Sequence, residues 1–325
     1  MNRLHRFSTL LLQFCMILAA NGVLAQAYPN HAIRLIVGGA PGSVPDTLAR
    51  PVAERLSSAL EQPVVVENRP GAAGIIAMEA LSRSAADGYT LALATMSQAV
   101  FNSYLFSKLP YDPQRDLEPV ATLATGAMVL AAHPSFPGRS LQEYVTLARS
   151  QPGTLFVAMP QAGSPPHVIA LLLNGAAGID VTMVPHKSGT DAVASVLSGE
   201  IPLIIDAPTI ISPHVQTGRL RALAVTGQQR EDALPGIPTV RESGFPAVEG
   251  EAWIGLVAPI GTPTAISLRL NREIASILTT PEMQALMAKF SFRTLVKSPA
   301  EFRSLINNDH AKWSAVIREA KLKLD

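Results

Sequence analysis

Short apolar runs alternate with stretches of helical spacing along the chain from residue 33 onward. Helical spacing is clearest at Leu48, Val52, Leu56 and Leu60, which fall four apart and place apolar side chains on one face. Pro51 lies inside that stretch, where it is expected to bend the helix. The apolar runs predict strands at Ile33–Val37, Val64–Glu67, Thr90–Ala94, Val120–Leu123, Ala127–Ala132, Leu155–Ala158, Thr182–Val184, Leu203–Asp206, Leu220–Thr226 and Trp253–Ala258.

Further stretches of helical spacing lie between these runs. They predict helices at Gly74–Ser82, Leu141–Arg149, His167–Ala176, Thr190–Ser198, Thr264–Leu278, Pro281–Lys289 and Ala300–Glu319. Strands that alternate with helices are typical of parallel or mixed sheets with helices on both faces. The pattern therefore predicts an α/β fold.

Residues 1–27 have the organisation of a secretory signal peptide. Arg3 and Arg6 precede the apolar run Leu10–Ala20, and small residues close the segment around Ala27. The run is too short for a membrane span of about 20 residues. We expect export of the chain and cleavage after about Ala27.

Charge and cysteine content exclude several classes of function. Without residues 1–27 the chain has 298 residues, enough for about two domains, with 24 basic and 25 acidic side chains. Nucleic-acid binding calls for a basic surface, so we expect no nucleic-acid partner. Cys15 is the only cysteine and lies in the signal segment, which excludes disulfides and thiolate metal sites from the rest.

A Gly- and Pro-rich corner, residues 38–46, follows the first predicted strand and precedes the first helix. Backbone N–H groups at a helix start are unpaired and favour an anion, and Gly42 and Ser43 leave room and a hydroxyl for one. The spacing fits neither a P-loop nor the G-x-G-x-x-G fingerprint, so we expect no nucleotide and no cofactor. The alternative is a plain turn in which Asp46 caps the helix.

A second corner of the same kind, residues 159–167, contains Gly163, Ser164 and His167 after the strand at 155–158. Thr95 and Ser97 follow another predicted strand in the same way. Ligand sites in α/β folds lie outside the carboxyl ends of strands, so several such corners point to one binding site.

Three further polar residues occupy comparable places. His167 begins a predicted helix, where packing or hydrogen bonding is the alternative to a site role. Lys187 follows the strand at 182–184 and is either a surface residue or a cation lining the site. Asp206 ends the run at 203–206 and is either a turn residue or a ligand contact.

Hydrolytic and metal-dependent chemistry are not indicated. No G-x-S-x-G nucleophile elbow occurs at these corners, and none of the histidines after the signal segment forms H-E-x-x-H or another close ligand pair. We therefore expect a binding protein without a metal, and not an enzyme.

Several longer stretches carry a family resemblance over nearly the whole chain after the signal segment. They are Tyr28-Pro29 with Ile33–Val37, Pro41-Gly42-Ser43 with Asp46, Gln62–Ala72 (QPVVVENRPGA), Asp87–Leu91 (DGYTL), Leu109–Pro113 (LPYDP), Gly163-Ser164 with Pro166-His167, Leu220–Thr226, Pro238–Val240, and Ala258-Pro259 with Gly261–Pro263. In combination the chain resembles the Bug or TctC family, the extracytoplasmic solute-binding receptors of tripartite tricarboxylate transporters.

The resemblance implies a two-lobe periplasmic-binding-protein (Venus flytrap) fold that closes on a small carboxylated solute in the periplasm. It implies a first lobe of residues 28–121 and 230–325 and a second lobe of residues 122–229. Its partners would be the membrane components of such a transporter, with the receptor a monomer. A periplasmic sensor acting on a signalling kinase, or a receptor for a non-carboxylate molecule, is the alternative.

The resemblance also implies that the two corners hold a carboxylate. The residues expected to line the site are Pro41, Gly42, Ser43, Val44, Asp46, Thr95, Ser97, Gly163, Ser164, His167, Lys187 and Asp206. The chain departs from the family's usual corner motifs at Ser43, Val44, Met159, Pro160, His186 and Ala207. These departures lie at the expected binding site, so they affect which ligand is expected, and they leave the motifs that indicate the fold unchanged.

Overall fold

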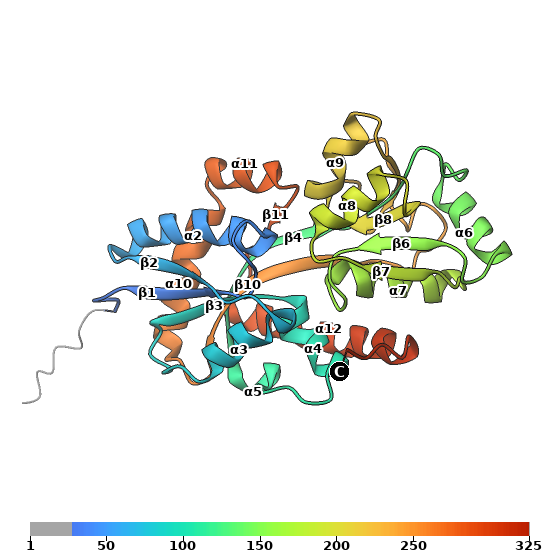
Figure 1. Ribbon diagram of the computed structural model, residues 1–325. Helices are drawn as coiled ribbons and strands as arrows, with labels where there is room; N and C mark the ends of the chain where they lie inside the picture. The colour runs from blue at the N-terminus through green and yellow to red at the C-terminus, as the bar shows by residue number, and fades with distance from the viewer. Residues whose placement is uncertain (1–27, 325) are drawn as a thin grey trace, which may run out of the picture.

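Two mixed β-sheets form the centres of two lobes in the computed structural model, which describes residues 28–324 (Figure 1). The predicted signal peptide lies outside the described residues. The larger sheet has six strands in the order β11-β4-β10-β3-β1-β2. They are β1 (Ile33–Val37), β2 (Val64–Asn68), β3 (Thr90–Thr95), β4 (Leu117–Ala127), β10 (Glu251–Pro259) and β11 (Arg293–Thr294).

The smaller sheet has five strands in the order β7-β6-β8-β5-β9. They are β5 (Val129–Ala132), β6 (Phe156–Met159), β7 (Thr182–Pro185), β8 (Leu203–Asp206) and β9 (Arg221–Val225). β1, β2 and β3 pair in parallel, and so do β6, β7 and β8. The carboxyl ends of each parallel set therefore meet at one edge of its sheet, as ligand sites in α/β folds require.

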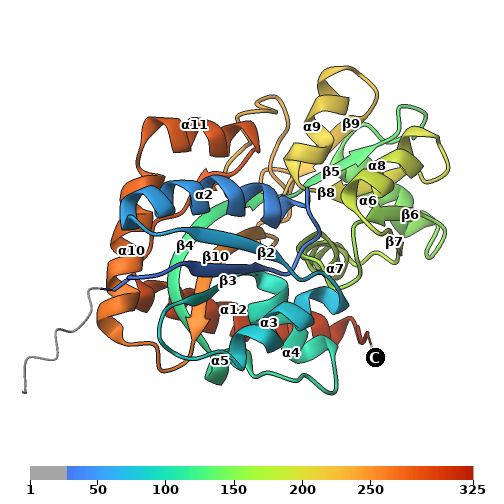
Figure 2. The same ribbon diagram turned by 60° about the vertical axis from the view of Figure 1, so that its left-hand side comes forward.

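Helices cover both sheets. Figure 2 shows α2 (Val44–Leu60) and α11 (Pro281–Lys289) on one side of the larger sheet and α3 (Ile75–Ser82) on the other. The other helices are α4 (Asn102–Leu105), α5 (Pro113–Asp116), α6 (Leu141–Ser150), α7 (Pro165–Ala177), α8 (Gly189–Leu197), α9 (Pro208–Gln216), α10 (Thr264–Leu278) and α12 (Pro299–Glu319), with a 3₁₀ turn at Ala72–Gly74 and a π-helical turn at Ser97–Phe101.

The predicted two-lobe α/β fold is confirmed, and α2 continues through Pro51. The sequence pattern missed α9, in which Pro208 and Pro213 interrupt helical spacing, together with the π-helical turn and the short elements α4, α5 and β11. It also predicted one strand over residues 127–132, where β4 ends and β5 begins on either side of Met128.

The two connections between the sheets lie side by side. The chain leaves β4 for β5 at Met128 and returns between β9 and β10. Thr226 joins these connections, because its hydroxyl accepts the Met128 N–H over 2.8 Å and donates to the Gly250 carbonyl over 2.6 Å. The lobe boundaries at residues 122 and 229 stay a prediction.

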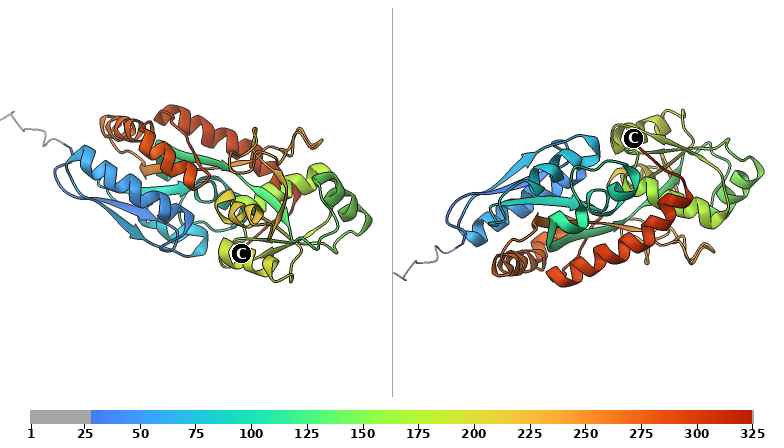
Figure 3. Two further views of the ribbon diagram at one scale, coloured as in Figure 1. Left: turned by 90° about the horizontal axis from the view of Figure 1, so that it is seen from above. Right: turned by 90° about the horizontal axis from the view of Figure 1, so that it is seen from below.

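α12 packs against elements of both lobes. It contacts β4 in the larger sheet and α7 beside the smaller one, and Figure 3 shows it running beneath the molecule from one lobe toward the other. Asp309 on α12 accepts hydrogen bonds from the indole N–H groups of Trp253 and Trp313, over 2.6 Å and 3.1 Å. Within residues 28–324, no helix combines the length and apolar character needed to cross a bilayer.

Candidate functional site

The first corner is a tight turn at the carboxyl end of β1. The Ser43 N–H donates to the Ala40 carbonyl over 3.0 Å, with Pro41 and Gly42 between them. Gly42 has φ +80°, which a type II turn requires at its third residue, and Pro fits the second. Ser43 is then the N-cap of α2 in extended conformation.

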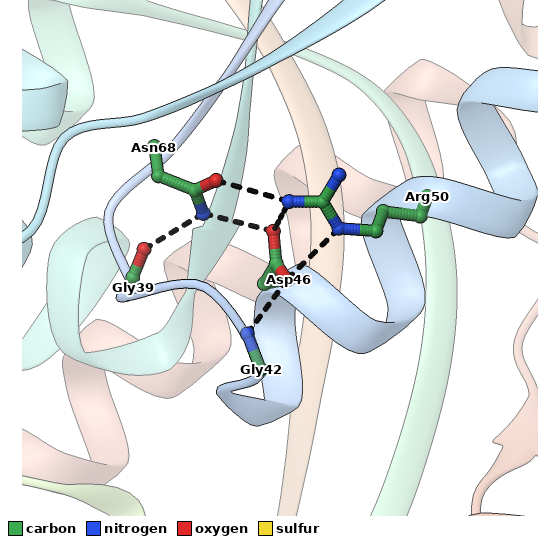
Figure 4. A network of polar contacts seen from close by, with 5 residues as sticks. All are labelled: Gly39, Gly42, Asp46, Arg50 and Asn68. Carbon is green, nitrogen blue, oxygen red and sulfur yellow. Dashed lines mark hydrogen bonds and ion pairs between the residues drawn. The ribbon is translucent and has the colours of Figure 1, made fainter.

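Asp46, in the first turn of α2, braces this corner from inside (Figure 4). Its buried carboxylate accepts hydrogen bonds from the Gly42 N–H over 2.8 Å, from two nitrogens of Arg50 over 3.0 Å and 2.9 Å, and from Asn68 Nδ2 over 2.9 Å. Asn68 also donates to the Gly39 carbonyl over 3.0 Å.

Burial alone would raise the pKa of Asp46, but the hydrogen bonds from Arg50, Gly42 and Asn68 hold it below the usual value. The positive charge of the paired Arg50 offsets the negative charge of this carboxylate at the corner. Asp46 thus lies at the first corner, as predicted, and stabilises the turn through its hydrogen bond with the Gly42 N–H.

The second corner repeats the first in geometry. The Ser164 N–H donates to the Gln161 carbonyl over 3.1 Å, Gly163 has φ +75°, and Ser164 is the extended N-cap of α7. The Gly163 N–H donates to Nδ1 of His167 over 3.1 Å, just as the Gly42 N–H donates to Asp46 four residues on. Gly42–Asp46 (GSVPD) and Gly163–His167 (GSPPH) are therefore two copies of one turn.

His167 differs from Asp46 in charge. Burial lowers the pKa of His167 to about 4, so the ring is neutral at neutral pH. Its Nδ1 accepts the Gly163 N–H, which leaves the proton on Nε2. Each corner is thus held by a side chain four residues on, an ion-paired carboxylate in one lobe and a neutral imidazole in the other.

The two N-cap hydroxyls are without a hydrogen-bond partner. Ser43 Oγ and Ser164 Oγ are both buried, and neither caps its own helix. Ser43 Oγ lies against Gly39, where a Cβ would come within 2.2 Å of it. A hydroxyl donor at a helix N-terminus, where the dipole favours negative charge, matches a carboxylate oxygen.

The π-helical turn after β3 connects the lobes. Ser97 Oγ donates to the Gly163 carbonyl over 3.1 Å, so the ends of β3 and β6 meet here. Thr95 and Gln98 brace the turn, because Gln98 Oε1 accepts both the N–H and the hydroxyl of Thr95. Gln98 Nε2 also donates to the Ala73 carbonyl over 3.2 Å. π-helical turns occur frequently at functional sites.

Asp206 lies buried at the carboxyl end of β8. Its Oδ1 accepts the Ala207 N–H over 2.7 Å, whereas Oδ2 has no partner and lies where a Cβ on Gly189 would come within 2.2 Å. Burial raises the pKa of Asp206 to about 7. Lys187 follows β7 as an exposed residue, and its carbonyl accepts from Gln161 Nε2 over 3.3 Å.

Hydrogen bonds therefore join four pairs of the predicted residues, Gly42 with Asp46, Gly163 with His167, Ser97 with Gly163, and Ser97 with Thr95. A surface hollow of about 590 Å³ lies elsewhere, between α4, α5 and His310, and none of the predicted site residues lines it. In residues 28–324, no group of three or more His, Cys, Asp or Glu side chains is arranged to hold a metal.

Sequence reasoning identified Asp46, His167 and Thr95 but missed Arg50, Asn68 and Gln98, which brace the corners with them. The spacing of Asp46 and Arg50, four apart on a helix, was the available signal for their ion pair. Aligning GSVPD with GSPPH would have indicated the repeated turn. Nothing local pointed to Asn68 or Gln98, since their partners are set by the tertiary fold.

The family described as "Tripartite tricarboxylate transporter family receptor" (TctC) matches residues 48–322. Protein BugT of Bordetella pertussis is 33% identical over 303 residues, which cover 93% of each chain.

Two solved structures are similar in fold. Rpa4515 from R. palustris, solved with adipate, superposes with a TM-score of 0.84 at 30% identity, over 91% of this chain and all of the other. MatC (Rpa3494) from Rhodopseudomonas palustris, with bound malate, superposes with a TM-score of 0.79 at 29% identity, over 89% and 100%. A further solved structure, described as periplasmic binding protein BugD, superposes with a TM-score of 0.80 at 26% identity, over 91% of this chain and all of the other, and the matching family is one of receptors and not of enzymes. The chain belongs to the TctC family of tripartite tricarboxylate transporter receptors.

Proposed function

We propose that this protein is a periplasmic receptor that captures a small organic acid between its lobes and delivers it to the membrane components of a tripartite tricarboxylate-type transporter. The observation that carries the proposal is the repeated turn. Each lobe presents a Gly–Ser corner whose hydroxyl, Ser43 Oγ or Ser164 Oγ, is buried without a partner at a helix N-terminus. The adipate and malate bound to the two neighbours support a carboxylate ligand.

No covalent bond is made or broken in this mechanism. The solute binds the closed arrangement better than the open one and shifts the population toward it, and the membrane partner then recognises the closed form. His167 is neutral and the charge of Asp46 is paired with that of Arg50, so neither residue adds an uncompensated negative charge that would repel the acid. We further propose that residues 1–27 direct export and are removed, and that the receptor acts as a monomer.

A thermal-shift panel tests the ligand class. Butyrate, adipate, malate and citrate are each compared with adipamide, which has the shape of adipate without its charges. We expect at least one acid to stabilise the protein, by about 2.7 kcal/mol at a concentration a hundredfold above its Kd, and adipamide to have no effect. Ser43→Ala and Ser164→Ala should each reduce the shift, with Ser58→Ala on the exposed face of α2 as the matched control. Stabilisation by adipamide alone would overturn the proposal.

Uptake tests delivery. Deletion of the chain's gene should abolish uptake of the radiolabelled acid that stabilises the protein, and the intact gene should restore it. Unchanged uptake together with loss of a transcriptional response to the acid would instead identify a sensor.

A further inference from the structure

The tail that follows α12, residues 321–324, reaches the second corner. The Leu324 N–H donates to the carbonyl of Leu105, the last residue of α4, over 2.9 Å. Lys323 Nζ donates to the Tyr104 carbonyl over 2.9 Å. These bonds fix the tail along α4, and Figures 1 and 3 place the end of the described chain beside α4 and the lobe of the smaller sheet.

Two leucines cover Gly163 from this side. A Cβ built on Gly163 would lie 2.6 Å from Leu105 Cδ1 and 2.8 Å from Leu324 Cδ1. At the equivalent Gly42 of the first corner, a Cβ would meet no atom within 4 Å. The two copies of the turn thus differ in one respect, since the second is packed against side chains of the opposite lobe.

The same glycine also carries the polar contact between the lobes. Its carbonyl accepts the Ser97 hydroxyl, while the two leucine side chains occupy the space where a Cβ on this residue would lie. Leu105 is fully buried and Leu324 is half-buried, so replacing the side chain of Leu324 would remove apolar contact from the lobe interface.

We infer that the tail is part of the binding apparatus, with Leu324 a positioning residue that holds the second corner against the larger lobe. In this role Leu324 and Leu105 act through the corner, against which both side chains lie. They fix where Ser164 and the start of α7 lie relative to Ser97, and therefore how well the two corners converge on one ligand. The effect on affinity rests on the proposed function, whereas the effect on lobe geometry does not.

Spin-label distances test this inference without a solute. Cysteines at Ser58 on α2 and Gln216 on α9, both exposed and on opposite lobes, give specific labelling because residues 28–325 contain no cysteine. We expect Leu324→Ala, and a chain ended after Leu322, to lengthen or broaden the distance distribution between the labels. Leu268→Ala, at an exposed leucine on α10, is the matched control, and Leu324→Met should restore the original distribution.

The expected binding result is at least a fivefold weaker Kd for Leu324→Ala, measured with the panel acid that stabilises the unaltered protein most. A label distribution identical in Leu324→Ala, the shortened chain and the unaltered protein would overturn the inference. A changed distribution without stabilisation by any acid would support the tail's role and contradict the carboxylate proposal, so the two failures are distinguishable. Circular dichroism of each variant checks that the fold is retained.

Discussion

The hydroxyl of Ser97, in the larger lobe, donates a hydrogen bond over 3.1 Å to the carbonyl of Gly163 in the smaller lobe. Ser97 begins the π-helical turn after β3, Gly163 lies in the turn after β6, and the hydrogen bond between them is buried. The contact therefore ties the position of the second corner to the larger lobe.

Removal of this hydroxyl should weaken solute binding. Ser97→Ala loses one hydrogen bond, worth about 1 kcal/mol, from the closed arrangement, so the Kd of the acid ligand should rise about fivefold. Calorimetric titration measures the change. Ser58→Ala serves as the control, and an unchanged Kd in Ser97→Ala would mean that the bond adds nothing to closure.

The two turn glycines should differ in their tolerance of a methyl group. Gly42→Ala places Cβ in open space and incurs only the backbone penalty of a positive φ, about 1–2 kcal/mol. Gly163→Ala incurs that penalty and forces Leu105 and Leu324 apart as well, which should destabilise the fold further. Urea unfolding of both variants tests the order, and equal losses would contradict the packing described at Gly163.

Asp46→Asn should destabilise the protein in a pH-dependent way. The folded-state pKa of Asp46 is lowered, so the stability it contributes is present above the unfolded pKa of about 3.9 and is lost as pH falls through the folded value. At pH 7 we expect a loss of about 1–3 kcal/mol from the hydrogen bonds to the carboxylate. The free energies of unfolding of the unaltered protein and of Asp46→Asn, measured at pH 7 and pH 3, should lie closer together at pH 3. A difference that is the same at both pH values would exclude ionisation of Asp46 as the cause.

Asp206→Asn should have the opposite effect. The folded-state pKa of Asp206 is raised to about 7, so the unaltered protein loses stability as pH rises from about 4 to about 7. Asparagine does not ionise, so the variant should not lose this stability. Above pH 7 its free energy of unfolding should exceed that of the unaltered protein by up to about 4 kcal/mol. Urea unfolding at pH 5 and pH 8 measures the change, and a gain that is the same at both pH values would argue against a buried ionising carboxyl.

Much of the architecture followed from local pattern. Every predicted strand corresponds to one in the structure, because short apolar runs between turn residues are determined by nearby sequence. α9 was missed since Pro208 and Pro213 disrupt the spacing on which helix prediction depends. The π-helical turn has no periodic signature of its own, and its place is set by contacts such as that of Gln98 with Ala73.

The site was predictable as a set of corners but not as a set of contacts. Gly42, Ser43, Gly163 and Ser164 follow strands and precede helices, which the sequence indicates directly. The bonds that shape them join residues far apart in the chain, as between Asp46 and Asn68. The approach of Leu324 to Gly163 spans even more of the chain and depends on the whole path of α12.

The close approach of Ser43 Oγ to Gly39 has a consequence for the evolution of this corner. Because the hydroxyl occupies the volume that a methyl group on residue 39 would need, any side chain at position 39 requires the Ser43 hydroxyl to turn away or be absent. Relatives with a larger residue at the position of Gly39 should therefore carry glycine at the position of Ser43, and such pairs should change together rather than singly.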